Sequence, residues 1–251
     1  MKFKVVTLFP ENLSLSLDYG VIGKAQKEKI IEIEYINPRN YCENNKRSVD
    51  DKPYGGGPGM VIKAEPLLGA IEYAKQGVPE NCPVVFLSPQ GALFDQKQAR
   101  AFSKLNDLIL VSGRYEGIDE RVIDATVNAI EISIGNFVLS GGEIAASAII
   151  DAVSRLIPGT LGDELSALQD SFTDDLLDYP HYTRPEVLDN ISVPEVLVSG
   201  NHNASPVGEV VGVTDLAPIE IGQLGEMCVD KAVLKQALDW NVRVVHGLKT
   251  A

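Results

Sequence analysis

The chain has 251 residues and a net charge of −13; 45% of its residues are hydrophobic and 23% are charged. This composition is typical of a soluble globular protein with room for one large domain or two modest ones, each with its own core. The negative charge argues against a general nucleic-acid binder, because affinity for phosphates comes from Lys and Arg, so any nucleic-acid site has to be a local basic patch.

The sequence gives no signal for secretion, membrane insertion or metal binding. The segment Met1–Phe9 turns polar too early for a signal peptide, and no apolar run approaches the roughly 20 residues of a membrane helix. We therefore expect a cytoplasmic protein without a membrane partner. Cys42, Cys82 and Cys228 lie far apart, with no C-x-x-C pair, and predict neither a disulfide framework nor a zinc site.

Short apolar runs alternate with helical patterns over the first 156 residues, which predicts an α/β fold. The runs VVFL and LILV are apolar at every position, as expected for strands of a buried parallel sheet. In chain order the predicted elements are a strand at 2–9, a helix at 13–29, a strand at 30–36, a helix at 65–76, a strand at 84–87, a helix at 96–105, a strand at 108–111, a helix at 120–125, a strand at 129–132 and a helix at 143–156.

The character of the sequence changes after Pro158 and Gly159. Residues 160–178 are rich in Asp, Glu, Ser and Leu with weak periodicity, which predicts a flexible linker. We expect a large domain over residues 1–159 and a smaller, mainly helical domain over residues 179–251, with helices at Pro185–Leu188 and Asp230–Trp240.

Four glycine-containing strings lie where an α/β sheet would bind a ligand. Glycine lets the backbone approach a ligand closely and adopts positive φ, although each glycine by itself could merely turn the chain. The strings are PYGGGPGM at 53–60, LSPQG at 87–91, GRYEGIDER at 113–121 and SIGNFVLSGGE at 133–143. The dinucleotide, P-loop and serine-hydrolase motifs are missing from the sequence.

Seven strings occur together in an order and spacing that resembles the bacterial tRNA (guanine-N1)-methyltransferases of the SPOUT class. They are DDKPYGGGPGM, LSPQG, GRYEGIDER, SIGNFVLSGGE, LIPG at 156–159, DSF at 170–172 and LLDYPHYTRPEVL at 176–188. The resemblance covers Met1 to about His202. It implies a trefoil-knotted domain, a flexible linker, a small helical C-terminal domain, a homodimer, and transfer of a methyl group from S-adenosylmethionine to N1 of the guanosine 3′ of the anticodon, position 37.

The resemblance also assigns the residues of the site. Those implied to bind S-adenosylmethionine are Leu87, Ser88, Pro89, Gln90, Gly113, Tyr115, Glu116, Gly117, Ile134, Gly135, Phe137, Leu139, Gly141 and Gly142. The family commonly has tyrosine at Phe137, and a contact made through the backbone would survive that change. Mg²⁺ is implied as a cofactor without a recognisable metal cage, so that Glu116 or Asp170 could bind it weakly through water.

By the same resemblance Asp170 is the base and Arg155 the cation. Methylation at guanine N1 needs a group that takes the N1 proton and a donor that stabilises charge on O6. Acidic neighbours would raise the pKa of Asp170 and make it a better base. From the residues alone, an acidic linker is an ordinary solvated surface and Arg155 an ordinary cation near a helix end.

The candidates for binding tRNA are basic residues, Lys46, Arg47, Lys52, Arg114, Arg121 and Arg184. After His202 the chain departs from the family, which continues into an arginine-rich helix. Residues 201–251 carry four basic and six acidic side chains, a net charge of −2. Two other hypotheses stay open: a SPOUT enzyme with a different RNA target, and a non-catalytic RNA-binding homologue.

Overall fold

A computed structural model describes residues 1–43, 47–162 and 181–198. The chain divides into two compact units, Met1–Ala167 and Leu168–Ala251, and each is described by itself. The predicted linker at 160–178 lies almost wholly outside the described residues, so the predicted domain boundaries stay predictions. No helix in the described part of the chain is both long and apolar enough to cross a membrane.

The first unit is an α/β structure, as the alternating pattern predicts. Its elements in chain order are β1 (Lys2–Val6), α1 (Pro10–Leu17), α2 (Gly20–Lys27), β2 (Glu32–Ile36), the 3₁₀ helix η1 (Pro38–Tyr41), β3 (Asp50–Asp51), β4 (Val61–Ile62), α3 (Ala64–Ala74), β5 (Val84–Leu93), α4 (Gln96–Phe102), β6 (Asp107–Ser112), α5 (Glu120–Ala125), β7 (Ala129–Ser133) and α6 (Glu143–Ser154).

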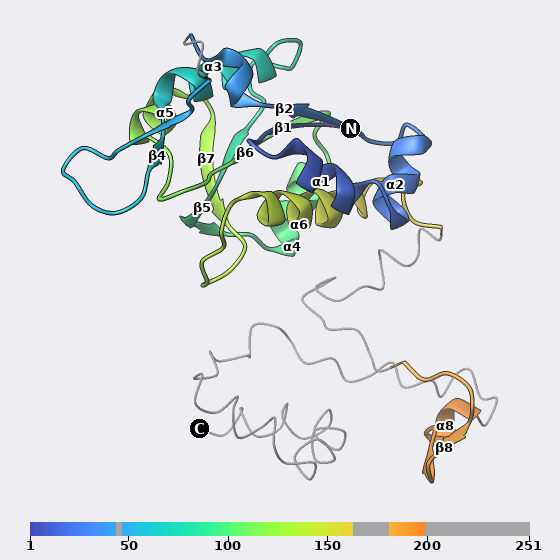
Figure 1. The fold of residues 1–251 in the computed structure, drawn as a ribbon. Helices are drawn as coiled ribbons and strands as arrows, with labels where there is room; N and C mark the ends of the chain where they lie inside the picture. The colour runs from blue at the N-terminus through green and yellow to red at the C-terminus, as the bar shows by residue number, and fades with distance from the viewer. Residues whose placement is uncertain (44–46, 163–180, 199–251) are drawn as a thin grey trace, which may run out of the picture. The chain divides into compact units, whose positions relative to one another are not determined.

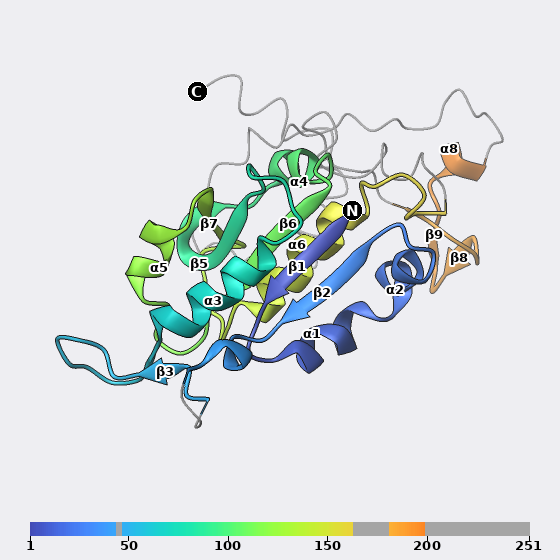
Figure 2. The same cartoon turned by 90° about the horizontal axis from the view of Figure 1, so that it is seen from above.

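Five strands form one parallel sheet in the order β2-β1-β6-β5-β7. Figure 1 and Figure 2 show α3 and α5 on one face of this sheet and α1, α4 and α6 on the other. The strand β6 is central and almost entirely buried, since its LILV run is covered on both faces. The two faces contribute to two separate hydrophobic clusters, one with α1, α2, α4 and α6 and one with α3 and α5.

The single helix predicted over residues 13–29 is wrong, because the segment forms two helices. Helix α1 ends at Leu17, and α2 begins at Gly20 after a break. Gly20 has φ +62°, which is the left-handed conformation that interrupts a helix and that glycine adopts without a steric penalty. A helical pattern of side chains continues across the break, which explains why periodicity alone did not reveal it.

Strand β5 is longer than the predicted run of four residues and takes in the LSPQG string. Its pairing with β7 shifts register between Leu87 and Ala92, both of which lie opposite Ile132. The strand is therefore irregular where it contains Pro89, which has no N–H group to donate to a sheet. The string therefore lies within an inner strand of the sheet and is not a separate loop.

A short antiparallel pair, β3 and β4, carries the PYGGGPGM string between its strands. The segment 52–60 extends away from the sheet in both views (Figure 1 and Figure 2). Gly55, Gly56, Gly57 and Gly59 all have positive φ, and Tyr54 is fully exposed.

The described part of the second unit, residues 181–198, contains a two-stranded hairpin and one short helix. Strands β8 (Val187–Leu188) and β9 (Ile191–Ser192) pair with each other, and α8 spans Glu195–Val198. The helix predicted at Pro185–Leu188 is wrong, because that segment leads into β8. The helix predicted at Asp230–Trp240 lies outside the described residues.

Candidate functional site

A cleft of about 390 Å³ opens at the carboxyl ends of β6 and β7, beside the irregular part of β5. Its size is within the range of small-molecule sites, roughly 300–1,000 Å³. The structure brings to this cleft every one of the residues that the resemblance assigns to the cofactor: Leu87, Ser88, Pro89, Gln90, Gly113, Tyr115, Glu116, Gly117, Ile134, Gly135, Phe137, Leu139, Gly141 and Gly142. That they bind S-adenosylmethionine stays a prediction.

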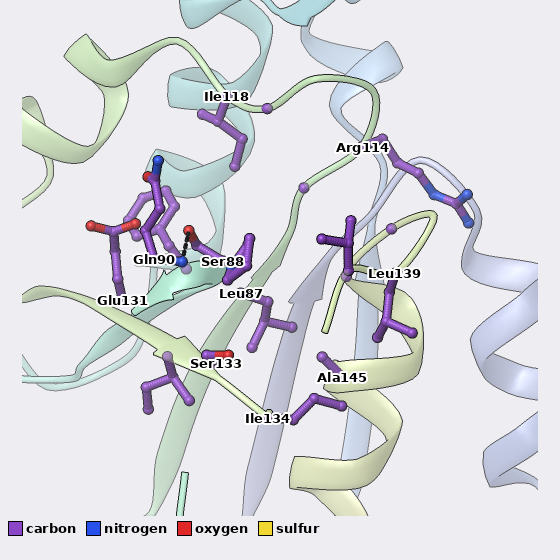
Figure 3. A pocket seen from close by; sticks show the side chains of 18 of the residues that line it. Leu87, Ser88, Gln90, Arg114, Ile118, Glu131, Ser133, Ile134, Leu139 and Ala145 are labelled. Carbon is purple, nitrogen blue, oxygen red and sulfur yellow. Dashed lines mark hydrogen bonds between the residues drawn. The ribbon is translucent and has the colours of Figure 1, made fainter. Parts of the chain in front are cut away.

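The walls of the cleft differ in polarity. Figure 3 shows Gln90 and Glu131 next to each other on one side, and Leu139 and Ala145 on the side formed by α6. The Ser88 hydroxyl accepts a hydrogen bond from the backbone N–H of Gln90 at 3.2 Å. The cleft therefore suits a ligand that has both an apolar and a charged or polar part.

The segment 113–117 forms one rim and is joined to β4. The backbone N–H of Glu116 donates to the Met60 carbonyl oxygen, and the Gly117 carbonyl oxygen accepts from the N–H of Ile62, each at 3.0 Å. Tyr115 has φ +63°, an unusual conformation for a bulky residue. Unfavourable backbone conformations of this kind are most frequent at functional sites, where the surrounding structure holds them in place.

An ion pair between a half-buried arginine and a buried glutamate joins this rim to the opposite one. Arg114 Nε donates to Glu143 Oε2 at 2.9 Å, and Arg114 Nη1 donates to the Ser140 carbonyl oxygen at 3.1 Å. The other carboxylate oxygen of Glu143 accepts from the Thr7 hydroxyl at 2.9 Å. In Figure 3 the Arg114 side chain points away from Leu87 and Ser88.

Of the other basic candidates, Arg121 is exposed and pairs with Asp119, with its Nε donating to Oδ1 at 2.8 Å. The hydrogen bond from Arg121 lowers the pKa of the Asp119 carboxyl group. Arg47 and Lys52 are exposed in the first unit and Arg184 is exposed in the second, while Lys46 lies outside the described residues. Binding of tRNA by these residues stays a prediction.

Comparison with known proteins decides the family. The model of the family described as tRNA (Guanine-1)-methyltransferase TrmD matches residues 1–206. The chain belongs to this family.

Three relatives named tRNA (guanine-N(1)-)-methyltransferase illustrate the similarity. The chain is 58% identical to the protein from Hahella chejuensis over 200 residues, which are 80% of this chain and 77% of the relative. It is 52% identical to the protein from Tolumonas auensis and 54% identical to that from Aeromonas hydrophila, in both cases over 198 residues and 79% of each chain.

Of the two residues that the resemblance implies for catalysis, the structure describes only Arg155. Asp170 lies outside the described residues. Arg155 follows the last residue of α6, whereas the cleft lies at the first residues of that helix. Because each residue of a helix adds about 1.5 Å, twelve residues separate the two ends by roughly 18 Å.

Sequence reasoning missed part of the cleft and the ion pair between Arg114 and Glu143. Glu131 and Ala145 line the cleft without belonging to any glycine string, and nothing in the sequence marked them. Glu143 is the last residue of the SIGNFVLSGGE string, but the sequence predicted no function for it. Within the residues that the structure describes, no group of three or more His, Cys, Asp or Glu side chains could hold a metal ion.

Proposed function

We propose that the chain transfers a methyl group from S-adenosylmethionine to N1 of the guanosine 3′ of the anticodon, position 37, in tRNA. One observation carries the proposal: fourteen family site residues, drawn from three separate strings, line a single cleft. Relatives that are more than 50% identical over most of the chain have names that include the guanine-N1 activity. The proposal locates the enzyme in the cytoplasm with its tRNA substrate.

The cleft suits the chemistry of the cofactor. When bound, S-adenosylmethionine supplies a methyl group on a positively charged sulfur. Leu87, Ile134 and Leu139 would contact the adenine and exclude water from it, while backbone groups of the two glycine-rich rims would hydrogen-bond to its polar edge. The carboxylates of Glu116 and Glu131 would stabilise the positive charge of the ligand.

The remaining chemistry takes place at the guanine. N1 carries a proton, so a base has to remove it, and a cation has to stabilise the negative charge that develops on O6. Asp170 would be the base and Arg155 the cation. Since Arg155 lies at the far end of α6 from the cleft of its own chain, we infer that it serves the cleft of a second copy.

A homodimer is therefore part of the proposal, together with a knotted first domain, a flexible linker and a helical C-terminal domain. In the first unit α1 and α6 each expose one large apolar side chain, Leu15 at 68% and Ile144 at 58%. A hydrogen bond between the Ser16 and Ser147 hydroxyls, 3.0 Å long, joins the two helices. Covering these side chains with a second copy would bury them on both chains.

The test combines calorimetry with analysis of the product. The purified chain should bind S-adenosylmethionine or its demethylated product at one site per chain, with no competition from NAD or ATP. After reaction with tRNA, digestion to nucleosides should yield 1-methylguanosine, and nuclease mapping should place it at position 37. A methyl group on another base or on a ribose would indicate a different SPOUT enzyme, and cofactor or RNA binding without methyl transfer would indicate a non-catalytic homologue.

A further inference from the structure

Glu143 is a carboxylate buried inside the first unit, 5% exposed, at the first position of α6. Both of its oxygens accept a hydrogen bond. Oε1 accepts from Thr7, which directly follows β1, and Oε2 accepts from Arg114, which follows β6. A buried carboxylate is strongly disfavoured unless such partners compensate it, so these contacts have to persist in the folded protein.

Through Arg114 the carboxylate reaches both rims of the cleft. Arg114 belongs to the rim 113–117, and its Nη1 group donates to the Ser140 carbonyl oxygen of the rim 134–142. The two rims also share a backbone hydrogen bond, from Gly142 N–H to the Gly113 carbonyl oxygen at 2.9 Å. The Arg114 side chain is thus a second connection, besides this backbone bond, between two segments that both line the cleft.

The surroundings of Arg114 leave it little freedom. Its guanidinium lies over the Phe9 ring at 4.6 Å from the ring centre, a cation–π contact. The Phe9 N–H donates to the Thr7 hydroxyl, which itself donates to Glu143. A side chain at Gly141 would collide with Arg114. Phe9 and Glu143 therefore hold the guanidinium, Thr7 holds Glu143, and Gly141 leaves the Arg114 side chain room.

A purely structural explanation is that an acidic residue near a helix N-terminus stabilises the helix. That effect requires neither burial nor a bond to a neighbouring rim, and an exposed acid would supply it equally well. Glu143 is buried, and its partners come from the ends of two strands of the sheet.

We propose that Glu143 is a positioning residue, which through Arg114 sets the separation of the rims 113–117 and 134–142 and so the affinity of the cleft for S-adenosylmethionine. This inference rests on the proposed function. Both carboxylate oxygens are occupied within the fold, and the residue acts through Arg114 rather than on the ligand. It also gives Arg114 a role inside the chain, distinct from contact with tRNA.

The test is Glu143→Gln, which keeps the size of the side chain and one acceptor oxygen but loses the charge. The Kd for S-adenosylmethionine and for its demethylated product should rise roughly tenfold, because the loss of one charge-assisted hydrogen bond lowers the population of the binding-competent arrangement of the rims by about that factor. The effect should appear in KM for the cofactor more than in kcat. Hydrogen exchange of the unliganded protein should be faster in both rims.

Glu72→Gln is the matched control, since Glu72 is an exposed carboxylate on α3, a helix of the other face of the sheet. It should change neither the Kd for S-adenosylmethionine nor the rate of hydrogen exchange in the rims.

Arg114→Gln provides a second route in case Glu143→Gln does not fold. It should raise the Kd for S-adenosylmethionine to a similar degree. Where both variants fold, the double variant should have a Kd no higher than that of either single variant, because the two residues form one link.

The outcomes separate the two proposals. Wild-type protein that binds no S-adenosylmethionine would overturn the proposed function and this inference with it. Wild-type binding with an unchanged Kd and unchanged rim exchange in folded Glu143→Gln, or an unchanged Kd in folded Arg114→Gln, would overturn the inference alone.

Discussion

At Tyr35 a hydroxyl group is buried without a hydrogen-bond partner among the described residues. Burial, aided by the nearby negative charge of Asp18, raises the pKa of Tyr35 from 10.0 to about 12. A group whose pKa is raised by folding resists ionisation in the folded state. Its contribution to stability is complete below pH 10 and is lost as the pH rises from about 10 to about 12.

We predict that Tyr35→Phe increases the free energy of unfolding by about 1 kcal/mol at neutral pH, because it removes a buried polar group that lacks a partner. Above pH 10 the difference between the variant and the wild type should widen, since only the wild type loses stability through this group. Urea unfolding at a series of pH values measures both effects. Tyr19→Phe, at an exposed position, should show neither.

For Asp170 we predict that replacement by alanine lowers kcat roughly 10²–10⁴-fold while the Kd for S-adenosylmethionine stays close to that of the wild type. The reason is that the carboxylate acts on the guanine and not on the cofactor. Single-turnover methylation and calorimetry on the same preparation measure the two quantities. Asp174→Ala, which removes another acid of the same segment, is the control. Near wild-type turnover in Asp170→Ala would show that Asp170 is not the base.

Residues of the candidate site could be predicted from the sequence where they belong to a recognisable string, and not where they meet through long-range contacts. Three of the four glycine strings marked the cleft, because glycine is needed where the backbone turns or approaches a ligand. The hydrogen bond between Thr7 and Glu143 joins residues 136 positions apart in the sequence, and no local pattern predicts it. Contacts of this kind become visible only once the order of the strands is known.

Among the elements, the tetrapeptide PEVL shows the limit of local reasoning because it occurs twice. At Pro185–Leu188 it leads into β8, and at Pro194–Leu197 it enters α8. The first copy is followed by Asp189 and Asn190, which both have positive φ and form the two-residue turn of a hairpin. This Asp-Asn pair was the overlooked signal. The alternation of strands and helices was predictable, whereas the strand order was not.

The close contact between β5 and β7 gives a prediction for the sheet. A Cβ atom at Gly91 would meet the Glu131 carbonyl oxygen at 2.6 Å and would also overlap the backbone N of Ile132. We predict that Gly91→Ala lowers the free energy of unfolding by about 1–3 kcal/mol, the usual cost of overpacking, and also weakens cofactor binding. Thermal unfolding and calorimetry measure the two effects. A control is Gly162→Ala, where no atom lies within 4 Å; equal stability of the two variants would contradict the prediction.

For the whole molecule, light scattering at micromolar concentration should give twice the 27.1 kDa mass of one chain. We predict that Leu15→Glu combined with Ile144→Glu yields a folded monomer without methyl transfer, because charges at these exposed apolar positions of α1 and α6 oppose association. Val127→Glu is the control, since Val127 is an exposed apolar residue outside both helices. A wild-type chain that is monomeric under these conditions would contradict the proposed dimer.

The acidic C-terminal segment has a consequence for tRNA binding. Residues 201–251 lie outside the described structure and carry a net charge of −2, and the family model ends at residue 206. We predict that a chain ending near Gly200 that still forms a dimer binds tRNA with nearly the same affinity and salt dependence as the full chain, because an acidic segment makes few phosphate contacts. Filter binding at several salt concentrations measures both. A large loss of affinity with a much shallower salt slope on truncation would show that the segment binds phosphates.

The strand order β2-β1-β6-β5-β7 determines what the chain can do while it is being synthesised. Strands β1 and β2 can pair as soon as the first 36 residues have left the ribosome, but one edge of β1 stays open until β6 at residues 107–112 arrives. Strand β5 has no neighbour before that moment, because both of its partners follow it in sequence. At roughly 5–20 residues per second the open edge of β1 therefore has no partner for several seconds, and both edges of β5 have none for about one to four seconds. The cleft is complete only after Ala145 has emerged, and no ligand of the cleft can assist the earlier steps.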